Sequence, residues 1–325
     1  MHFIRVLCGA LALAALGVTT SPAAAQTWPT RSIAAISPFS AGNAVDIVGR
    51  VVLDQVSRQL GQPIVIENRP GAGGTVAFNA VAKATPDGYT MLLGSSTFSS
   101  GVVLHKTLPY DTLHDFAAVI PFGIQPSVLV TPPSKGFKTV ADLVAAAKAK
   151  PGVLNYASAG VGAASHIAAE RLRVSTGIVA QHVPFRGPNE ALAEVIAGRI
   201  DFYFLPIAPA LPLVKSGQLV ALAVSTPQRA PSMPDVPTTA EAGYPAAFYL
   251  FWSGLFVPAK TPPEVIARLY DESRKALDLA SVQDSLSKLG VQPQRMTSAE
   301  FQKFFAADVA ETVKLAEKAG IVPTD

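Results

Sequence analysis

The sequence contains very little cysteine. Its 325 residues include only Cys8, which lies in an N-terminal segment with a positive residue, Arg5, an apolar run over residues 6–18 and small residues up to Ala25. This pattern is typical of a secretory signal peptide, and its apolar run is shorter than the roughly 20 residues that a membrane-spanning helix needs. We therefore predict that residues 1–25 are a cleaved signal peptide. The mature chain would then have no disulfide, thiol nucleophile or cysteine metal ligand.

Charge is also scarce. Charged residues make up 15% of the sequence, the net charge is +3, and acidic and basic residues are evenly spread. This composition excludes the basic surface expected of a nucleic-acid-binding protein. The most apolar later segment, residues 200–214, is interrupted by prolines and cannot form a spanning helix. A content of 49% apolar residues predicts a globular protein of one or two domains.

Several kinds of chemistry lack the residues that they need. The histidines that follow residue 25 have neither a metal-binding spacing nor a nearby pair of acids, so we predict no metal site. The glycine cluster at 71–74 has Val76 where a dinucleotide motif needs its third glycine, and no phosphate-loop lysine occurs, which predicts no nucleotide cofactor. Ser165 and His166 are chain neighbours outside any Gly-x-Ser-x-Gly motif, so we predict no catalytic residue.

What the sequence does contain is a regular alternation of short apolar runs and helical patterns. It predicts α/β lobes with parallel sheets covered by helices. Strands are expected at 32–36, 63–67, 89–94, 128–130, 154–157, 182–185 and 200–204. A helix is expected over 44–60, ended by Gly61, and capping-box spacings occur at Thr139/Asp142, Thr261/Glu264, Ser281/Asp284 and Thr297/Glu300. The helical last quarter has too little strand for a sheet of its own, so we expect it to pack back on the first lobe.

The loops at the carboxyl ends of the predicted strands are rich in Gly and Ser. The first, "PFSAGNAVD" at residues 38–46, leads directly into a helical pattern. Because the carboxyl ends of parallel strands meet at one edge of a sheet, these loops predict a cleft lined by main-chain N–H groups, hydroxyls and the cation Arg186. Such a cleft suits a small anion that is bound without reacting. A set of ordinary caps and turns stays open as the alternative.

Motifs along the whole mature chain resemble those of the Bug proteins, the extracytoplasmic receptors of tripartite tricarboxylate transporters. In the first part they are residues 37–42 (SPFSAG) with Asp46, 68–74 (NRPGAGG) and 85–90 (TPDGYT). Further on they are 156–166, 182–187 (HVPFRG), 237–243 (PTTAEAG) and 254–258 (GLFVP), in the order expected of the family.

The resemblance implies a two-lobed type II periplasmic-binding-protein fold with a ligand cleft between the lobes. We expect lobe 1 to comprise residues 26–126 and 250–325, and lobe 2 residues 127–249. The resemblance to the Bug proteins also implies a periplasmic, non-enzymatic monomer. This monomer would bind a small carboxylate without a cofactor and deliver it to membrane subunits of the transporter. Carried over by motif, the expected ligand contacts are Phe39, Ala41, Gly42, Asn43, Asp46, Ser95, Thr97, Gly160, Gly162, Ala163, Ser165, His166, Arg186 and Gly187. Asp46 is expected to order the first turn rather than to touch an anion.

Three positions depart from the family pattern. Asn43 replaces a second glycine, Ala163 replaces Ser or Thr, and Leu205 replaces a frequent polar residue. Together with Phe98, an apolar Leu205 at the pocket edge would favour an aromatic or medium-chain carboxylate over citrate. Two other functions stay open: a periplasmic sensor subunit that signals to a kinase, and a secreted hydrolase.

Overall fold

The larger sheet has five strands in the order β2-β1-β3-β10-β4. They are β1 (Ile33–Ser37), β2 (Ile64–Asn68), β3 (Thr90–Ser95), β4 (Phe116–Gln125) and β10 (Phe251–Pro258). β1 pairs in parallel with β2 and β3, whereas β10 is antiparallel to β3 and β4. The expectation of a purely parallel sheet is therefore wrong, because the chain returns late to this sheet and inserts β10 from the opposite direction.

This computed structural model describes residues 28–323, so the predicted signal peptide lies outside the described residues. The described residues 28–30 belong to a unit separate from residues 31–323, and they contain no helix or strand. No helix within the described part of the chain is both long and apolar enough to cross a membrane.

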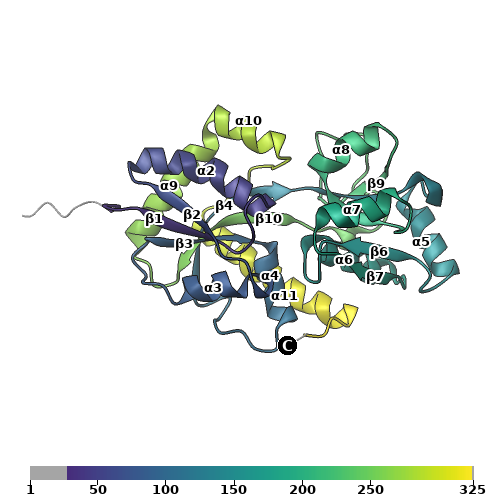
Figure 1. Ribbon diagram of the computed structural model, residues 1–325, viewed down its shortest axis with the longest axis horizontal. Helices are drawn as coiled ribbons and strands as arrows, with labels where there is room; N and C mark the ends of the chain where they lie inside the picture. Colours follow the sequence, from purple (N-terminus) through teal and green to yellow (C-terminus); the bar gives the residue numbers. More distant parts are fainter. Residues whose placement is uncertain (1–27, 324–325) are drawn as a thin grey trace, which may run out of the picture. The chain divides into compact units, whose positions relative to one another are not determined.

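Helices cover both faces of the five-stranded sheet (Figure 1). One face carries α2 (Ala44–Leu60), α9 (Pro263–Asp278) and α10 (Ala280–Lys288), and the other carries α3 (Thr75–Ala82), α4 (Ser96–Leu104) and α11 (Ser298–Ala319). Between the second set and the sheet lies an aromatic core that includes Phe98, Phe256 and Phe305. The last quarter of the chain thus packs on the first lobe, as expected.

Helix ends follow the predicted signals in part. Gly61 ends α2 with φ 68°, a left-handed conformation that glycine adopts without steric cost. Reciprocal capping boxes begin α5 at Thr139 and α11 at Thr297, as predicted. The predicted boxes at Thr261 and Ser281 are wrong: the caps of α9 and α10 are Pro262 and Leu279, each one residue or more away. A short spacing motif does not fix a cap when proline or packing sets the first turn.

The remaining strands form two smaller sheets. β5 (Ser127–Thr131) pairs antiparallel with β8 (Tyr203–Pro206) and β9 (Val220–Val224), while β6 (Asn155–Ser158) pairs in parallel with β7 (Gln181–Pro184). The helices are α5 (Val140–Ala149), α6 (Ala164–Thr176), α7 (Pro188–Ile196) and α8 (Ile207–Lys215), with short 3₁₀ turns η1 (Ala72–Gly74), η2 (Pro133–Lys135) and η3 (Pro245–Ala247). The strand predicted at 200–204 lies slightly later, at β8.

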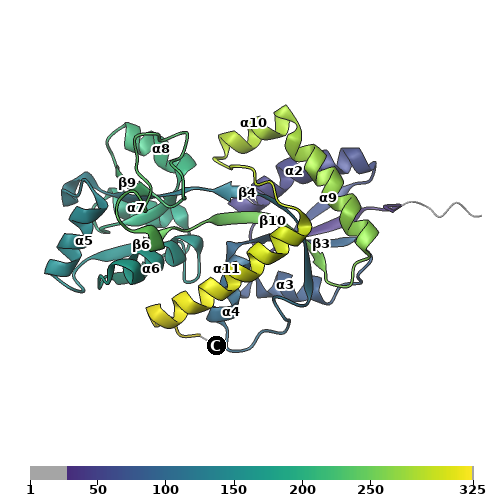
Figure 2. The same cartoon turned by 180° about the vertical axis from the view of Figure 1, so that it is seen from behind.

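We call the five-stranded sheet with its helices lobe 1 and the two smaller sheets with theirs lobe 2. The chain passes between them at β4–β5 and again just before β10. Lobe boundaries at 126/127 and 249/250 stay a prediction, which this strand order supports. Helix α11 of lobe 1 also reaches α6 of lobe 2, where the Arg173 guanidinium donates to the Ala319 carbonyl at 2.7 Å (Figure 2).

Candidate ligand pocket

A pocket of about 150 Å³ is lined by residues of both lobes. Lobe 1 contributes the start of α2, the end of β4 and the start of β10. Lobe 2 contributes the start of β5, the β6–α6 loop with the start of α6, β8 and the start of α7. The lining is mostly apolar, with two phenylalanines and several alanines. The lining residues are Ala44, Gln125, Ser127, Ala159, Ala163, Ala164, Ser165, Pro188, Tyr203, Phe204, Pro206 and Phe251.

The N-terminus of α6 opens on this pocket without a side-chain cap. Ala163 occupies the cap position and has no oxygen to accept from the first-turn amides. Within residues 28–323, the N–H groups of Ala164 and Ser165 have no acceptor, and both residues line the pocket. Uncapped N–H groups and the helix dipole both favour negative charge at such an end. The departure at Ala163 thus leaves main-chain donors available where a hydroxyl would have competed for them.

The preceding loop uses its other donors internally. The Ala159 N–H donates to Ser165 Oγ at 3.0 Å, the Gly160 N–H to Ser158 Oγ at 3.2 Å, and the Gly162 N–H to His166 Nδ1 at 3.1 Å. These bonds fix the loop shape before any ligand arrives. Ser165 lines the pocket, whereas the predicted contacts Gly160, Gly162 and His166 do not and instead order the loop.

Two histidine rings stack beneath this loop. His166 and His182 lie parallel with 4.0 Å between ring centroids, and Tyr156 stacks on His182 at 4.9 Å. Burial lowers the pKa of both histidines, and the neighbouring His166 contributes to lowering that of His182, to about 4. Both rings are therefore neutral near pH 7, and the Nδ1 of His166 is free to accept from the Gly162 N–H.

We expect the protein to lose stability on acidification because of His182. In the unfolded chain this ring binds a proton near pH 6.5, but in the folded chain only near pH 4, so between these values the unfolded chain holds more protons. Stability should fall by about 1 kcal/mol across that window, a modest value because the ring is only partly enclosed. Urea denaturation at several pH values measures it. His182→Gln, which keeps a polar group toward Ser158, should flatten this part of the profile; an unchanged slope would contradict the assignment.

The β1–α2 turn is organised around Asp46, which is 1% exposed. Its carboxylate accepts from the Gly42 N–H at 2.8 Å, from Arg50 at 3.0 Å and from Asn68 at 2.9 Å. Burial alone would raise the pKa of Asp46, but the hydrogen bonds from Arg50, Gly42 and Asn68 together hold it below its usual range. The contacts agree with the expected role of Asp46 in ordering the turn, and they leave the Gly42 N–H already engaged.

Asn43 caps α2. Its Oδ1 accepts from the Val45 N–H at 2.8 Å and the Asp46 N–H at 3.2 Å, and its Nδ2 donates to the Ser40 carbonyl. An ordinary N-cap explains its side chain without a ligand. The ligand contacts predicted in this turn all lie outside the pocket lining, and only the adjacent Ala44 reaches it. They are Phe39, Ala41, Gly42, Asn43 and Asp46.

The other predicted residues are also placed by the structure. Ser95 and Thr97 bond each other, with 2.5 Å between their hydroxyl oxygens, at the start of α4, and they lie outside the lining. Arg186 is exposed and has no ion pair in the described chain, and Gly187 is the cap of α7 next to the lining residue Pro188. Phe98 and Leu205 are 0% and 1% exposed within core clusters, so they do not edge this pocket.

Of the twelve residues that line the pocket, the sequence predicted only Ala163 and Ser165. Gln125, Ser127, Tyr203, Phe204 and Phe251 come from β4, β5, β8 and β10. Their only sequence signal was their place at the ends of apolar runs, and two of those runs were not recognised as strands. The apolar character that was predicted from Phe98 and Leu205 is supplied instead by Phe204 and Phe251.

The described residues contain no group of three His, Cys, Asp or Glu that could hold a metal ion. One serine–histidine contact exists, with 2.6 Å between Ser158 Oγ and His182 Nε2. Ser158 is 0% exposed and also bonds the main chain of Gly160, and the described hydrogen bonds include no carboxylate on His182. This pair lacks the access and the orienting acid of a hydrolytic triad.

Two α/β lobes joined by crossing segments, with a ligand-sized pocket lined by both, define the periplasmic-binding-protein class. A family model described as "Tripartite tricarboxylate transporter family receptor" matches residues 48–321. The chain therefore belongs to this receptor family, which includes the Bug proteins.

Individual relatives agree with this assignment. Protein BugT of Bordetella pertussis is 31% identical over 322 residues, covering 98% of this chain and 99% of BugT. The solved structure of R. palustris Rpa4515 with adipate has a TM-score of 0.81 and 31% identity, covering 91% of this chain and all of that one. MatC from Rhodopseudomonas palustris with bound malate has a TM-score of 0.77 and 30% identity, covering 89% of this chain and 99% of that one.

Proposed function

We propose that this protein is a periplasmic solute-binding receptor that captures a small carboxylate and passes it to the membrane subunits of a tripartite tricarboxylate-type transporter. One observation carries the proposal: the uncapped N-terminus of α6 lines a mostly apolar pocket to which both lobes contribute. Free N–H groups at Ala164 and Ser165 would hold one carboxylate, and lobe closure would enclose the rest. The protein would act as a monomer without a cofactor.

The pocket chemistry favours a ligand with an apolar middle. The side chains of Phe204, Phe251 and the alanines offer no hydrogen bonds to additional carboxylates or hydroxyls, whereas they can pack against methylene or ring carbons. Gln125, Ser127 and Tyr203 provide polar groups on the wall for a second ligand end. Adipate in one relative and malate in another support the carboxylate class, and the lining supports the longer, less polar chain.

We expect linear dicarboxylates such as adipate, or aromatic carboxylates, to raise the melting temperature of the mature protein more than citrate does. At a hundred times its dissociation constant a ligand adds about 2.7 kcal/mol of stability, which corresponds to an increase of about 5 °C or more. A thermal-shift screen measures the increase in melting temperature, and calorimetry then measures the dissociation constant. Tight binding of citrate with no binding of apolar acids would contradict the ligand chemistry, and no carboxylate binding at all would contradict the function.

Ala163→Asp tests whether the N-terminus of α6 binds the carboxylate. Its side chain would accept from the first-turn amides of α6 and stabilise the ligand-free protein by about 1 kcal/mol, since Asp is among the best helix caps. The same carboxylate would block the donors and repel the ligand, so binding should be lost. Ala163→Asn, which caps without charge, should stabilise similarly and weaken binding less. If Ala163→Asp still binds the carboxylate, the N-terminus of α6 is not part of the binding site.

A sensor subunit would use the same pocket, so ligand binding cannot separate it from a transport receptor. Capture experiments with the membrane subunits of a tripartite transporter on one side, and a kinase ectodomain on the other, would separate the two. We expect association with the transporter subunits in the presence of the bound carboxylate.

A further inference from the structure

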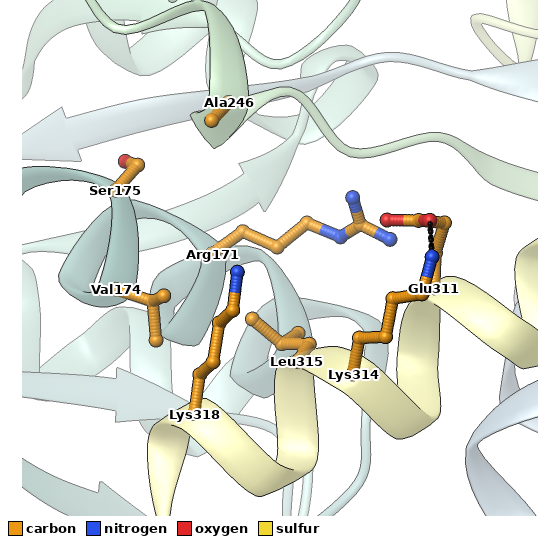
Figure 3. Close-up of a pocket in the computed structure, with 8 residues that line it drawn as sticks. All are labelled: Arg171, Val174, Ser175, Ala246, Glu311, Lys314, Leu315 and Lys318. Carbon is orange, nitrogen blue, oxygen red and sulfur yellow. Dashed lines mark hydrogen bonds and ion pairs between the residues drawn. The ribbon is translucent and has the colours of Figure 1, made fainter.

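A second pocket, of about 140 Å³, lies between α6 and α11 and shares no lining residue with the first (Figure 3). Helix α6 contributes Arg171, Val174 and Ser175, and Ala246 of η3 closes one side. Helix α11 contributes Glu311, Lys314, Leu315 and Lys318. Three of these eight side chains are cations and one is an anion, so the pocket carries an excess of positive charge.

Arg171 is the least satisfied of these groups. Its Nε is buried without a hydrogen-bond partner, and among the described residues its guanidinium acts on the Glu311 carboxylate only at a distance, without a close ion pair. The rings of Phe248 and Tyr249 lie 5.5 and 5.8 Å from the guanidinium carbon and supply only weak cation–π contacts. A charged donor left without an acceptor is costly when buried, which calls for a partner in the pocket.

The neighbouring acidic residues do not provide Arg171 with a hydrogen-bond acceptor. Glu311, the one acid on the lining, pairs with Lys314 at 3.0 Å and lies beyond ion-pair distance of Arg171. Asp308, about one turn before Glu311 on α11, accepts from the Trp252 indole at 2.9 Å, and Arg171 is the weakest of the influences on its carboxylate. Lys318 has no ion pair in the described chain, and Figure 3 shows its amine directed toward the Arg171 side chain. Glu311 is thus the single carboxylate of a lining that holds three cations, and Lys314, Arg171 and Lys318 all act on it electrostatically. Two positive charges of the lining stay unbalanced.

We propose that this pocket is a second anion site, which takes a small oxyanion such as a phosphate or carboxylate group. Arg171 would bind it through its guanidinium, with Lys318 as the second cation, while Val174 and Leu315 form the apolar wall. A planar guanidinium with several donors suits an oxyanion with two or three acceptor oxygens. Because α6 belongs to lobe 2 and α11 to lobe 1, a bound anion would tie the two lobes together at this side.

Inorganic phosphate is the probe for this site. In the mature protein, titration with phosphate at constant ionic strength, maintained with chloride, should raise the melting temperature in a saturable way. Arg171→Gln should weaken the apparent phosphate affinity by at least tenfold, and the exposed Lys318→Gln should weaken it less. Lys215→Gln, an exposed cation on α8, is the matched control and should leave the titration unchanged.

Each titration is compared with the chloride baseline of the same variant, so a loss of intrinsic stability does not imitate a loss of binding. Equilibrium dialysis with phosphate provides a second reading for Arg171→Gln. The absence of any saturable phosphate effect in the wild type would overturn the site. An equal effect in wild type and Arg171→Gln would place the anion elsewhere, for example at the N-terminus of α6.

Discussion

Replacing Gly162 with asparagine should weaken carboxylate binding by at least tenfold with little loss of stability. Gly162 has φ 75°, which asparagine tolerates better than most residues, so the backbone cost is small. Any Cβ at this position would lie 2.1 Å from Cδ1 of Leu104, at the end of α4 in lobe 1. The Leu104 side chain must shift to make room, and we expect this shift to push the β6–α6 loop of lobe 2 and the end of α4 apart, so that the pocket between the lobes opens. A tenfold loss corresponds to about 1.4 kcal/mol.

The chain offers a control at Gly177, which caps the other end of α6 with φ 68° and would place a Cβ in open space. Gly177→Asn should bind the carboxylate found in the thermal-shift screen as the wild type does. Leu104→Ala removes the obstructing side chain and should restore much of the affinity in the Gly162→Asn background. Calorimetry on these variants, with small-angle scattering for lobe separation, measures the effect. Equal weakening at Gly162 and Gly177, or no restoration by Leu104→Ala, would show that the contact between lobes does not control binding.

The local sequence predicted those elements whose ends have their own chemistry. Helix α2 runs from its asparagine cap to Gly61, and the boxes at Thr139 and Thr297 begin their helices as predicted. Each of these ends is decided by hydrogen bonds within four residues, which a single segment of sequence specifies. The same reasoning fails where packing or proline sets the helix start, as at Pro262.

The two longest strands were missed for an identifiable reason. β4 contains Pro121 and Gly123, which local propensity reads as breaks, yet β4 lies at the edge of its sheet, where proline is tolerated. Its pairing with β10 also contains register shifts at Gly254 and Leu255. Each of these strands is stabilised by a partner more than a hundred residues away along the chain, so no local sequence pattern predicts it.

In the pocket, too, the sequence predicted what is determined locally and missed what depends on distant parts of the chain. The β6–α6 loop was predicted from its glycines and serines, and Ala163 and Ser165 do line the pocket. Which N–H groups stay free could not be predicted, because that depends on whether Asp46 takes the Gly42 N–H and His166 the Gly162 N–H. Gln125 and Phe251 reach the pocket only because β4 and β10 pair side by side. Long-range pairing and competition for donors are properties of the folded chain, not of a motif.

The tie between α6 and α11 depends on a buried carboxylate, Glu170, which is 4% exposed. It accepts from the Tyr156 hydroxyl and from Arg173, whose Nη2 lies 2.7 Å from it and also donates to the Ala319 carbonyl. Burial raises the pKa of Tyr156, and Glu170 raises it further, which keeps the phenol protonated as a donor. Glu170 thus connects the ring stack beneath the candidate pocket to the C-terminal end of α11.

We expect Glu170→Gln to lower the free energy of unfolding by about 3 kcal/mol, because it leaves the Arg173 charge without its partner in a largely buried place. Tyr156→Phe removes one hydrogen bond but no charge and should cost about 1 kcal/mol. Asp54→Asn, which breaks an exposed pair with Arg58 on α2, should change little. Urea denaturation measures all three, and amide hydrogen exchange should show faster opening of the last turn of α11 in Glu170→Gln alone. A loss in Glu170→Gln no greater than in Asp54→Asn would mean that the two helices are held by apolar packing, and that the charge pair contributes nothing to joining the lobes.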